Sequence, residues 1–542
     1  MNRWSLLSLA VCGVVALPTL GVFGSVFVPG GEEWQHLVET RLGEYARNSL
    51  WLVLIVCTSA AVIGTAAAWV VTAFDFPGRR LLYWALLLPL AVPAYLSAYA
   101  LTDLLQFSGP VQTALREAFG WSRRDYWFPE VRSLGGAAAI LTFSLYPYVY
   151  LAARTAFVEQ SSGALEVART LGRGPWRSFF TLALPLARPS IAAGTALVAM
   201  ETLADFGAVD YCAVDTFALG VYRTWRSLES PVTAAQLSAV LLSVVAVLVF
   251  AELLARRRAR FFQLTTRRQP VRRQRLGWRG SVAALLVCGL PVALGFGLPA
   301  GVFVHMAWTT GDARAWEVVR DFTGNSVGLA ATASALAATL ALVVVYGRRL
   351  GGGVVHAAAG RVAGLGYALP GTVIAVGLII PLTWVDHRLN AAADAAFGWR
   401  PGLILTGGVA AVVLGYQCRF LGVALAMLDA SLGRVRPTLD DAARTLGASR
   451  LRMVLRVHLP LLRSSVAAAV LLVFVDVVKE LPVTLMLRPF NFETLAVRVY
   501  QLASDERLDE SAFGALVIIG VGLLPVVILS RLIDRHGREK QS

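Results

Sequence analysis

Apolar stretches long enough to cross a membrane recur along this chain, separated by short polar segments. A helix needs about 20 apolar residues to span the roughly 30 Å of hydrocarbon in a bilayer. The pattern predicts twelve spans, at about 5–29, 48–74, 81–104, 135–153, 190–212, 233–255, 281–305, 325–346, 362–384, 403–424, 465–487 and 512–533. The longest polar interruptions measure only about 40 residues, so we expect no large soluble domain.

Prolines and the N-terminal segment refine this pattern. Pro93 and Pro370 each fall inside a predicted span, where the missing N–H and the ring clash kink or break a helix. The first span lies where a secretory signal peptide would lie. Its apolar region is too long for one, however, and no small-x-small cleavage site follows cleanly, so we expect a retained helix.

The composition fits a membrane protein and suggests its orientation. Hydrophobic residues make up 57% of the chain and charged residues 15%, whereas soluble domains carry about 25% charged residues. The net charge is +15, and arginines crowd the segments after every second span, including 154–188, 256–279 and 434–463. Basic segments favour the cytoplasmic side, so we expect both termini in the cytoplasm. The run 256–279 is then a linker near anionic lipid, and we expect no nucleic-acid partner.

The sequence lacks the patterns that would indicate catalysis by this chain. Its five cysteines are scattered without a CxxC pair, so we expect small apolar packing residues and no metal site. The two lysines, Lys479 and Lys540, lie outside any GxxxxGK[ST] frame, which excludes ATP binding by a P-loop. We find no catalytic triad or redox motif. The chain is therefore predicted not to be an enzyme and to bind no cofactor itself.

One basic element occurs twice. Residues 166–185 read EVARTLGRGPWRSFFTLALP and residues 441–460 read DAARTLGASRLRMVLRVHLP, an offset of 275. Both copies follow the frame acid-x-Ala-Arg-Thr-Leu-Gly, twelve residues and then Pro, and both lie between predicted spans. Asn48-Ser49 and Asn325-Ser326 repeat at an offset of 277, as do Pro93 and Pro370. The chain is thus an internal duplication.

The duplication predicts the fold. Each half holds six spans, an even number, so both halves enter the membrane in the same direction. We expect an all-α integral membrane protein of about twelve helices, arranged as two parallel six-helix repeats. The first half is 1–255, a basic linker covers 256–280, and the second half is 281–542.

The repeated element has the pattern of a helix–turn–helix along the membrane face. In each copy an acid begins the first helix, an alanine keeps it slim, a glycine breaks it, and a proline fits the first turn of the next span. These residues are Glu166, Ala168, Gly172 and Pro185, and then Asp441, Ala443, Gly447 and Pro460. The alternative is an amphipathic loop that only rests on lipid headgroups. The identity of ARTLG in both copies favours a functional element.

This element resembles the coupling motif of bacterial ABC importer permeases, EAA-x3-G-x9-I-x-L-P. Asp441, Val167, Leu182 and Val457 are mild departures from that motif. The resemblance implies the type I importer permease fold in the bacterial inner membrane. It further implies two copies of a soluble ABC ATPase that bind ATP and dock on the repeated elements, with Glu166 and Asp441 as contacts and Gly172 and Gly447 as hinges. The competing classes are an ion-driven secondary transporter, which leaves the duplicated element unexplained, and a membrane-embedded enzyme.

Four acids stand at repeat-equivalent positions inside predicted spans, where charges are costly and often functional. Glu201 and Asp205 lie one turn apart, and Asp476 and Glu480 follow at the offset of 275. One interpretation is a cation path lined by pseudo-symmetric carboxylates. The other is helix-terminal acids that face water or pair with Lys479 and arginines.

Two segments suggest the cargo. The stretch 477–508 resembles the KELP-x-T-x-x-LRPF-x-F-x-TLA-x-R-x-Y signature of fused ferric-iron permeases, and residues 203–225 resemble that family's LADFG…TF…G-x-YR-x-W segment. The resemblance implies import of iron(III) delivered by a periplasmic binding protein. Permeases for thiamine, phosphonate, polyamine and sulfate share the fold and the motif, so these cargoes stay open.

Overall fold

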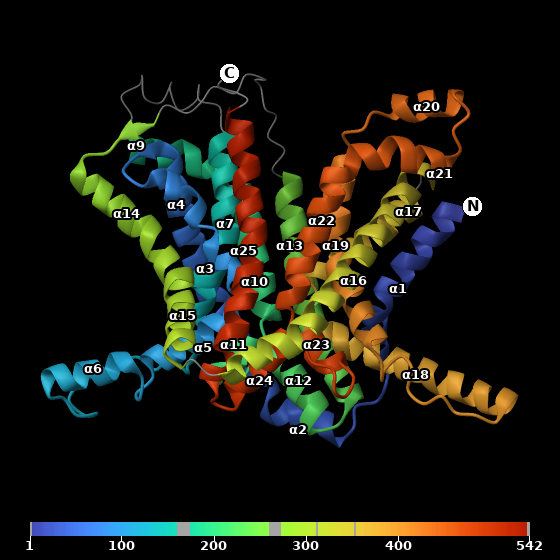
Figure 1. The fold of residues 1–542 in the computed structure, drawn as a ribbon, viewed down its shortest axis with the longest axis horizontal. Helices are drawn as coiled ribbons and strands as arrows, with labels where there is room; N and C mark the ends of the chain where they lie inside the picture. Colours follow the sequence, from blue (N-terminus) through green and yellow to red (C-terminus); the bar gives the residue numbers. More distant parts are fainter. Residues whose placement is uncertain (1–2, 160–173, 259–272, 311–312, 352–353, 539–542) are drawn as a thin grey trace. The chain divides into compact units, whose positions relative to one another are not determined.

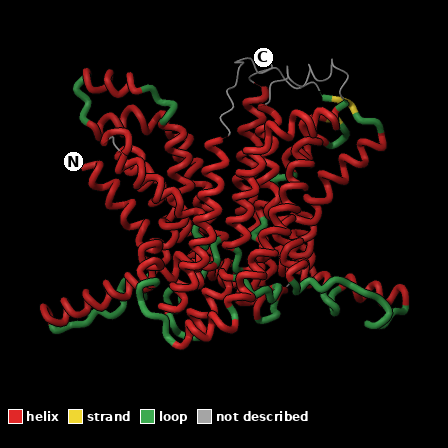
Figure 2. The backbone as a smooth tube through the Cα atoms, turned by 180° about the vertical axis from the view of Figure 1, so that it is seen from behind, coloured by secondary structure: helices red, strands yellow, loops and turns green. Residues whose placement is uncertain are grey.

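The computed structural model describes residues 3–159, 174–258, 273–310, 313–351 and 354–538, which are almost entirely helical (Figures 1 and 2). The first sequence half forms α1 (Arg3–Ser25), α2 (Glu32–Thr40), α3 (Leu42–Ala73), β1 (Phe74–Asp75), α4 (Arg79–Ala85), η1 (Leu88–Ala91), α5 (Ala94–Leu105), α6 (Pro110–Phe119), α7 (Leu134–Glu159), α9 (Pro175–Ser178), η2 (Phe179–Ala183), α10 (Leu184–Ala204), α11 (Gly207–Tyr211), α12 (Phe217–Ser227) and α13 (Pro231–Arg258).

The second half follows the same succession of long and broken helices. It forms β2 (Gln274–Arg275), α14 (Trp278–Val292), η3 (Ala293–Gly297), α15 (Leu298–Thr310), α16 (Ala313–Gly351), α17 (Val354–Gly364), η4 (Leu365–Ala368), α18 (Gly371–Phe397), α19 (Val409–Leu432), α20 (Pro437–Thr445), α21 (Arg450–Met453), η5 (Val454–His458), α22 (Leu459–Lys479), α23 (Pro482–Leu487), α24 (Leu495–Ser504) and α25 (Leu508–Arg538). The two-residue strands β1 and β2 pair in parallel, a detail that the hydrophobic pattern does not predict.

The predicted number of spans agrees with the structure. Among the described residues, 11 helices are long and apolar enough to cross a membrane, or 12 if the bent pair Arg79–Ala91 and Ala94–Phe119 is one span. Both predicted proline breaks are present, because Pro93 and Pro370 each lie between a short 3₁₀ helix and the next α-helix. Their backbone angles are nearly the same, with φ −56° and ψ 141° at Pro93 and φ −58° and ψ 140° at Pro370. The third span and the ninth are therefore broken helices.

The structure corrects the ends of two predicted spans. The fifth was expected to reach residue 212 and the eleventh residue 487, but α10 ends at Ala204 and α22 at Lys479. In both cases an acidic residue ends the long helix, and a short separate helix follows. Hydrophobicity continues across these breaks, so the apolar pattern does not mark them.

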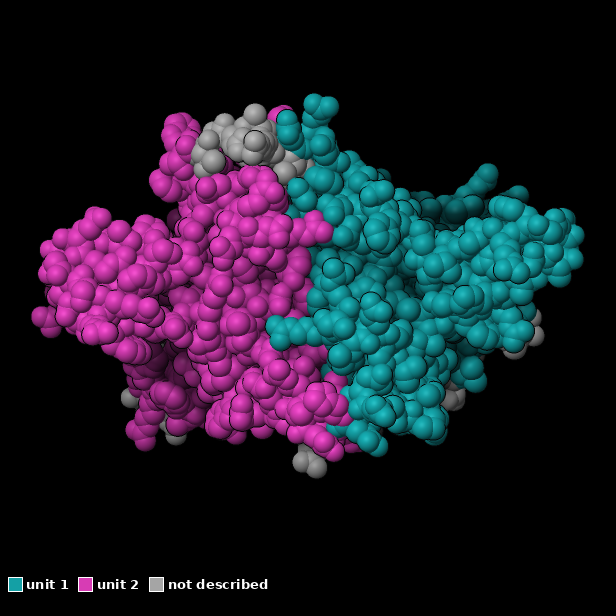
Figure 3. All heavy atoms as spheres, turned by 90° about the horizontal axis from the view of Figure 1, so that it is seen from below, with its two compact units in different colours: residues 1–35, 221–240, 317–498 teal, residues 36–220, 241–316, 499–542 magenta. Residues whose placement is uncertain are grey.

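The described chain forms two compact units, coloured separately in Figure 3. Unit 1 contains residues 1–35, 221–240 and 317–498, and unit 2 contains residues 36–220, 241–316 and 499–542. In unit 1 the first helix of the sequence, α1, packs along α17 and α18 of the second half. Gly21 and Gly377 allow the backbones of α1 and α18 to approach closely.

Unit 2 likewise combines both halves of the sequence. Its central helices are α3, α7 and α10, which pack on one another. Helices of the second half complete the unit, since α14 packs on α3, α15 packs on α25 and α5, and α25 packs on η1. The sequence halves and the compact units are thus different divisions of the chain, because terminal helices leave their own half to pack on the other.

Candidate functional site

The second copy of the repeated element forms the predicted helix–turn–helix. Its first helix is α20, and Gly447 follows in the left-handed conformation with φ +74°. The Gly447 amide donates to the carbonyl of Arg444 at 2.9 Å, and the Ala448 amide donates to the carbonyl of Ala443 at 3.0 Å. This pair of bonds is a Schellman cap, which explains why a glycine stands here.

The second helix of the element continues directly into the following span. The segments α21, η5 and α22 run on without a break, and Pro460 lies in the first turn of α22 as predicted. The π-helical turn η5 precedes this proline, as η2 precedes Pro185 in the first copy. A displacement of the loop therefore acts directly on the membrane-spanning helix.

Helix α20 has a buried face and an exposed face. Asp440 and Ala443 are 6% and 7% exposed and lie three residues apart on the buried face. Asp441 and Arg444, also three apart, lie on the exposed face and approach each other to 3.7 Å. Asp441 is thus available to a partner, whereas Asp440 belongs to the interior of the unit.

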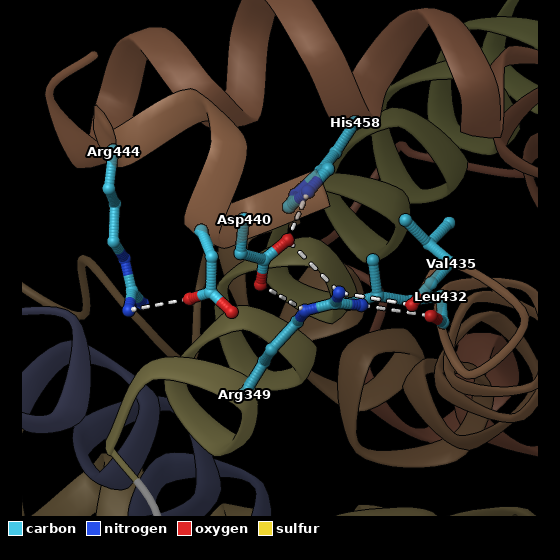
Figure 4. Close-up of polar contacts among 7 residues, drawn as sticks. Arg349, Leu432, Val435, Asp440, Arg444 and His458 are labelled. Atoms are coloured by element: carbon cyan, nitrogen blue, oxygen red, sulfur yellow. Dashed lines mark hydrogen bonds and ion pairs between the residues drawn. The ribbon is translucent and has the colours of Figure 1, made fainter. Parts of the chain in front are cut away.

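A buried network of charges fixes α20 to the span α16 (Figure 4). Arg349, near the C-terminus of α16, donates through Nε to Oδ2 of Asp440 at 2.8 Å and through an Nη to Oδ1 at 3.0 Å. The same guanidinium donates to the carbonyls of Leu432 at 2.9 Å and Val435 at 3.1 Å. Planar bidentate pairs of this kind have a fixed geometry, so Arg349 ties together α16, the end of α19 and the start of α20.

His458 connects the same carboxylate to α22. Its Nε2 lies 2.8 Å from Oδ1 of Asp440, and the side chain is fully buried. Its ring stacks on Tyr346 of α16, with centroids 5.5 Å apart and an interplanar angle of 11°. We name Arg349, Asp440 and His458 the polar anchor. No local pattern in the sequence marks these three residues. At the offset of 275 the first half has Leu165 and Ala183 in place of Asp440 and His458.

The first copy of the element can be described only in part. Glu166, Ala168 and Gly172 lie outside the described residues, and Pro185 lies in the first turn of α10. In η2, the turn that precedes this proline, Phe179 forms a buried cluster with Trp69 of α3 and Phe157 of α7, with ring centroids 5.1 to 6.2 Å apart. We name these three residues the aromatic anchor. At the repeat offsets they correspond to Tyr346, Leu432 and Val454.

The exposed surface of the second copy is partly apolar. Leu446 is 87% exposed, and Leu439, Leu451 and Leu455 also reach the surface. Exposed leucines beside the charged pair Asp441 and Arg444 give this element the mixed character of a surface that a protein partner covers.

Two of the four intramembrane acids cap short helices. Asp205 ends α10, and its Oδ1 accepts the amides of Ala208 and Val209 at 3.1 and 3.0 Å. Glu480 ends α22, and its carboxylate accepts the amides of Val483 and Thr484 at 3.0 and 3.1 Å. These bonds satisfy the first amides of α11 and α23. The predicted equivalence of the two acids therefore holds for their hydrogen bonds.

The other contacts of these acids differ between the two halves. Asp476 is 3.9 Å from Lys479 on the next turn of α22, which is one of the pairings that the sequence allowed. Glu480 also lies 3.9 Å from Arg419 of α19. Glu201 is half-buried on α10. The structure places the first pair, Glu201 and Asp205, in unit 2 and the second, Asp476 and Glu480, in unit 1.

The hydrogen bonds of the repeated Asn-Ser pair support the duplication. Asn48 donates to the carbonyl of Asp215 at 3.0 Å, and Asn325 donates to the carbonyl of Glu493 at 3.1 Å. Ser49 accepts the amide of Phe217, and Ser326 accepts the amide of Leu495. Each unit therefore joins the start of a span to the segment before α12 or α24 in the same way.

The metal chemistry of the described residues is limited. Within these residues no group of three or more His, Cys, Asp and Glu side chains could hold a metal ion. The cysteines are free thiols, and Cys12, Cys212, Cys288 and Cys418 are buried. This arrangement is compatible with their predicted role as small packing residues.

Comparison with known proteins gives one family and several relatives. A family model described as "Binding-protein-dependent transport system inner membrane component" matches residues 60–260 and again residues 333–539. Over 505 residues the chain is 26% identical to the Fe(3+)-transport system permease protein FbpB 2 of Haemophilus influenzae, covering 91% of each chain.

Two further relatives match shorter segments. The molybdenum transport system permease protein ModB of Escherichia coli is 36% identical over 145 residues, which cover 27% of this chain and 60% of that protein. The sulfate transport system permease protein CysT of Escherichia coli is 25% identical over 249 residues, which cover 45% of this chain and 87% of that protein.

Proposed function

Because this chain belongs to the family of binding-protein-dependent transport system inner membrane components, we propose that it imports ferric iron with energy from separate ATPase subunits. Its family consists of transport permeases and not of enzymes. The observation that carries the mechanism is the second coupling element, an exposed helix–turn–helix that continues into a membrane span. The observation that favours iron is the similarity to an Fe(3+)-transport permease over 91% of both chains.

In the proposed mechanism, two ATPase subunits dock on the two coupling elements. Asp441 and the exposed leucines of the second element contact one ATPase, and Glu166 belongs to the equivalent contact on the other. Closure of the ATPases on ATP moves α20. The Asp440 carboxylate transmits this movement through Arg349 to α16 and through His458 to α22, since both side chains hold it.

The charges of the chain suggest its orientation. The arginine-rich segments, including those of both coupling elements, lie in the cytoplasm with the two termini. A periplasmic binding protein delivers the cargo from the opposite side of the inner membrane, and alternation between outward and inward states admits it. Glu201, Asp205, Asp476 and Glu480 are candidate contacts along the path. Asp205 and Glu480 would contribute through the ends of the helices that they cap.

A second group of cargoes has specific support. Relatives of this chain include permeases named for molybdenum and for sulfate. These oxyanions differ in charge from ferric iron, so a direct comparison of uptake separates the two proposals. Thiamine, phosphonates and polyamines are the remaining cargoes suggested by the fold.

The test is uptake of radiolabelled ferric iron in a bacterial strain that lacks this chain and is complemented with it. We expect the native chain to restore uptake, and ATP depletion to abolish it. A Gly172→Val and Gly447→Val double variant should insert into the membrane normally but lose coupled uptake, because valine is strained at the positive φ of Gly447. Matched cells are tested with molybdate and sulfate.

Each result has a distinct meaning. Iron uptake that survives ATP depletion but fails without a proton gradient would contradict the ATPase mechanism. Uptake of an oxyanion and not of iron would contradict the proposed cargo and keep the mechanism. Normal uptake by the double valine variant would contradict the role of the two glycines.

A further inference from the structure

A cavity of about 470 Å³ lies beside the polar anchor in unit 1. It is lined by residues of α16, α17 and α19 and by the segment that enters α20. Its volume is in the range of cavities that hold small molecules. The proposed transport mechanism gives it no role.

One wall of the cavity carries a hydrogen-bonding group that lacks a bonding partner. His356 of α17 lines the cavity and is only 8% exposed. Its Nε2 is buried and has no hydrogen-bond partner within the described part of the chain. A buried imidazole nitrogen without a partner is costly, and a ligand in the cavity would supply the missing bond.

Arginines supply the charge at this site. Arg348 lines the cavity with 34% of its side chain exposed, and one of its Nη atoms lies 3.2 Å from the Asp429 carboxylate. A guanidinium has five N–H donors, so Arg348 can keep Asp429 and still bind an anion. Arg434 and Arg436 are exposed and alternate with the lining residues Gly433, Val435 and Pro437. These arginines, with Arg349, outnumber the nearby aspartates Asp429 and Asp440.

The position of the cavity suggests which anion it binds. Arg348 and Arg349 are the last two residues of the candidate span Val319–Arg349, so they lie at the depth of lipid headgroups. On α17, Val355 and Val362 are 64% and 47% exposed and lie seven residues apart on one face. An apolar face of this kind beside a basic cavity suits acyl chains next to a headgroup.

We propose that this cavity binds the phosphate of an anionic phospholipid headgroup of the phosphatidylglycerol or cardiolipin class. Arg348 contacts the phosphate oxygens, and Nε2 of His356 donates to the headgroup. Basic pockets between membrane helices on the cytoplasmic side bind such headgroups, and a guanidinium fork matches phosphate geometry. The assignment of this face to the cytoplasm comes from the proposed function, and the inference rests on the proposed function for that assignment alone.

The site would support the coupling element. Arg348 is adjacent to Arg349, which holds Asp440 and the carbonyls of Leu432 and Val435. Val435 and Pro437 line the cavity themselves. A bound headgroup therefore packs against the segment that leads into α20 and restricts its movement.

The experiment measures lipid binding to the purified full chain in a neutral detergent by native mass spectrometry. The probes are phosphatidylglycerol, phosphatidylcholine with the same acyl chains, and glycerol 3-phosphate. ATP, iron and partner proteins are absent from this experiment. The lipid-binding result therefore does not depend on whether the chain transports iron. The variants are Arg348→Gln, His356→Phe and the charge-preserving Arg348→Lys. Arg361→Gln is the matched control, since Arg361 is exposed on α17 and does not line the cavity.

We expect phosphatidylglycerol to bind the native chain at least fivefold more tightly than phosphatidylcholine. Arg348→Gln and His356→Phe should lose most of this preference, while Arg361→Gln should keep it within about twofold. Arg348→Lys should keep only part of it, because lysine retains the charge but lacks the guanidinium fork. Size-exclusion profiles matching the native chain identify variants that fold. Equal phosphatidylglycerol binding by native, Arg348→Gln and His356→Phe chains would overturn the proposal. Binding of glycerol 3-phosphate as tight as that of the lipid would also overturn it, because the site would then take a soluble phosphate.

Discussion

The two halves of this permease differ in the chemistry of the side chains around their equivalent π-helical turns. In unit 1 the polar anchor binds α20 through a buried carboxylate, with Arg349 and His458 on either side. In unit 2 the aromatic anchor of Trp69, Phe157 and Phe179 packs at the equivalent π-helical turn η2, at positions that correspond to Tyr346, Leu432 and Val454. The π-helical turns and the prolines that follow them are equivalent in both. A duplicated fold can therefore keep its backbone at these turns while the side chains around them differ in chemistry.

The difference between the two anchors affects how much stability each half loses on substitution. A buried ion pair contributes little net stability, but loss of one partner leaves an uncompensated charge. An aromatic cluster loses only the contacts of the residue that is removed. The polar anchor should therefore be the more sensitive to single substitutions and the aromatic anchor the more tolerant of conservative ones.

The largest effect is expected for Asp440→Ala. Arg349 would lose its counter-charge while its side chain stays 15% exposed, which should lower the free energy of unfolding by about 3–5 kcal/mol. The thermal midpoint of the purified protein in detergent measures this loss. Asp441→Ala is the matched control, because its side chain is 70% exposed and its removal should cost no more than about 0.5 kcal/mol. Equal midpoints for the two variants would refute the buried role of Asp440.

The next effect concerns the aromatic anchor. Trp69→Ala removes a side chain that is 4% exposed and contacts both phenylalanines, and should cost about 3 kcal/mol. Trp69→Phe keeps an aromatic ring and should cost less than half as much. The thermal midpoint measures both variants. Tyr346→Phe is the comparison in unit 1, because it keeps the ring that stacks on His458. If Trp69→Phe is as damaging as Trp69→Ala, ring packing is not the basis of this anchor.

Conversion of the polar anchor into an apolar one tests the comparison directly. The triple variant Arg349→Met, Asp440→Leu and His458→Ala removes all three polar groups together and gives the last two positions the residue types of Leu165 and Ala183 in the first half. It should regain about 2 kcal/mol or more of the stability lost in Asp440→Ala, because no unpaired charge remains. Recovery of stability without recovery of uptake would assign the polar groups to coupling. A triple variant less stable than Asp440→Ala would show that the ions themselves stabilise the fold.

The smallest effects should be equal in the two halves. Asn48→Ala and Asn325→Ala each remove one side-chain bond to a carbonyl, at 3.0 and 3.1 Å, and should each cost about 1 kcal/mol. The two losses should agree within about 0.5 kcal/mol, since the geometry is repeated. Denaturation of each single variant under identical conditions measures them. A difference above about 1 kcal/mol would show that the duplicated bonds have diverged in strength as the anchors have.

Much of the fold follows from the sequence because its signals are local. Apolar runs, arginine placement and the repeat determined the membrane class, the number of spans and the two parallel halves. Pro93 and Pro370 marked broken helices, because a proline acts on its own turn wherever it stands. Gly447 marked the turn after α20 for the same reason, since only its own φ is involved.

What only the tertiary structure decided is which side chains face one another. Asp440 and Asp441 are adjacent and chemically identical, yet one is buried against Arg349 and the other is exposed. Successive helical residues point about 100° apart, so the choice depends on where α16 and α22 cover α20, and no local pattern contains that information. The same holds for α1, whose place beside α18 depends on contacts far away in the chain. The sequence alone determined the approximate spans, the duplication and the helix–turn–helix pattern of the repeated element, because each depends on neighbouring residues. The anchors and the headgroup cavity required the folded structure, because their residues come from helices distant in the sequence.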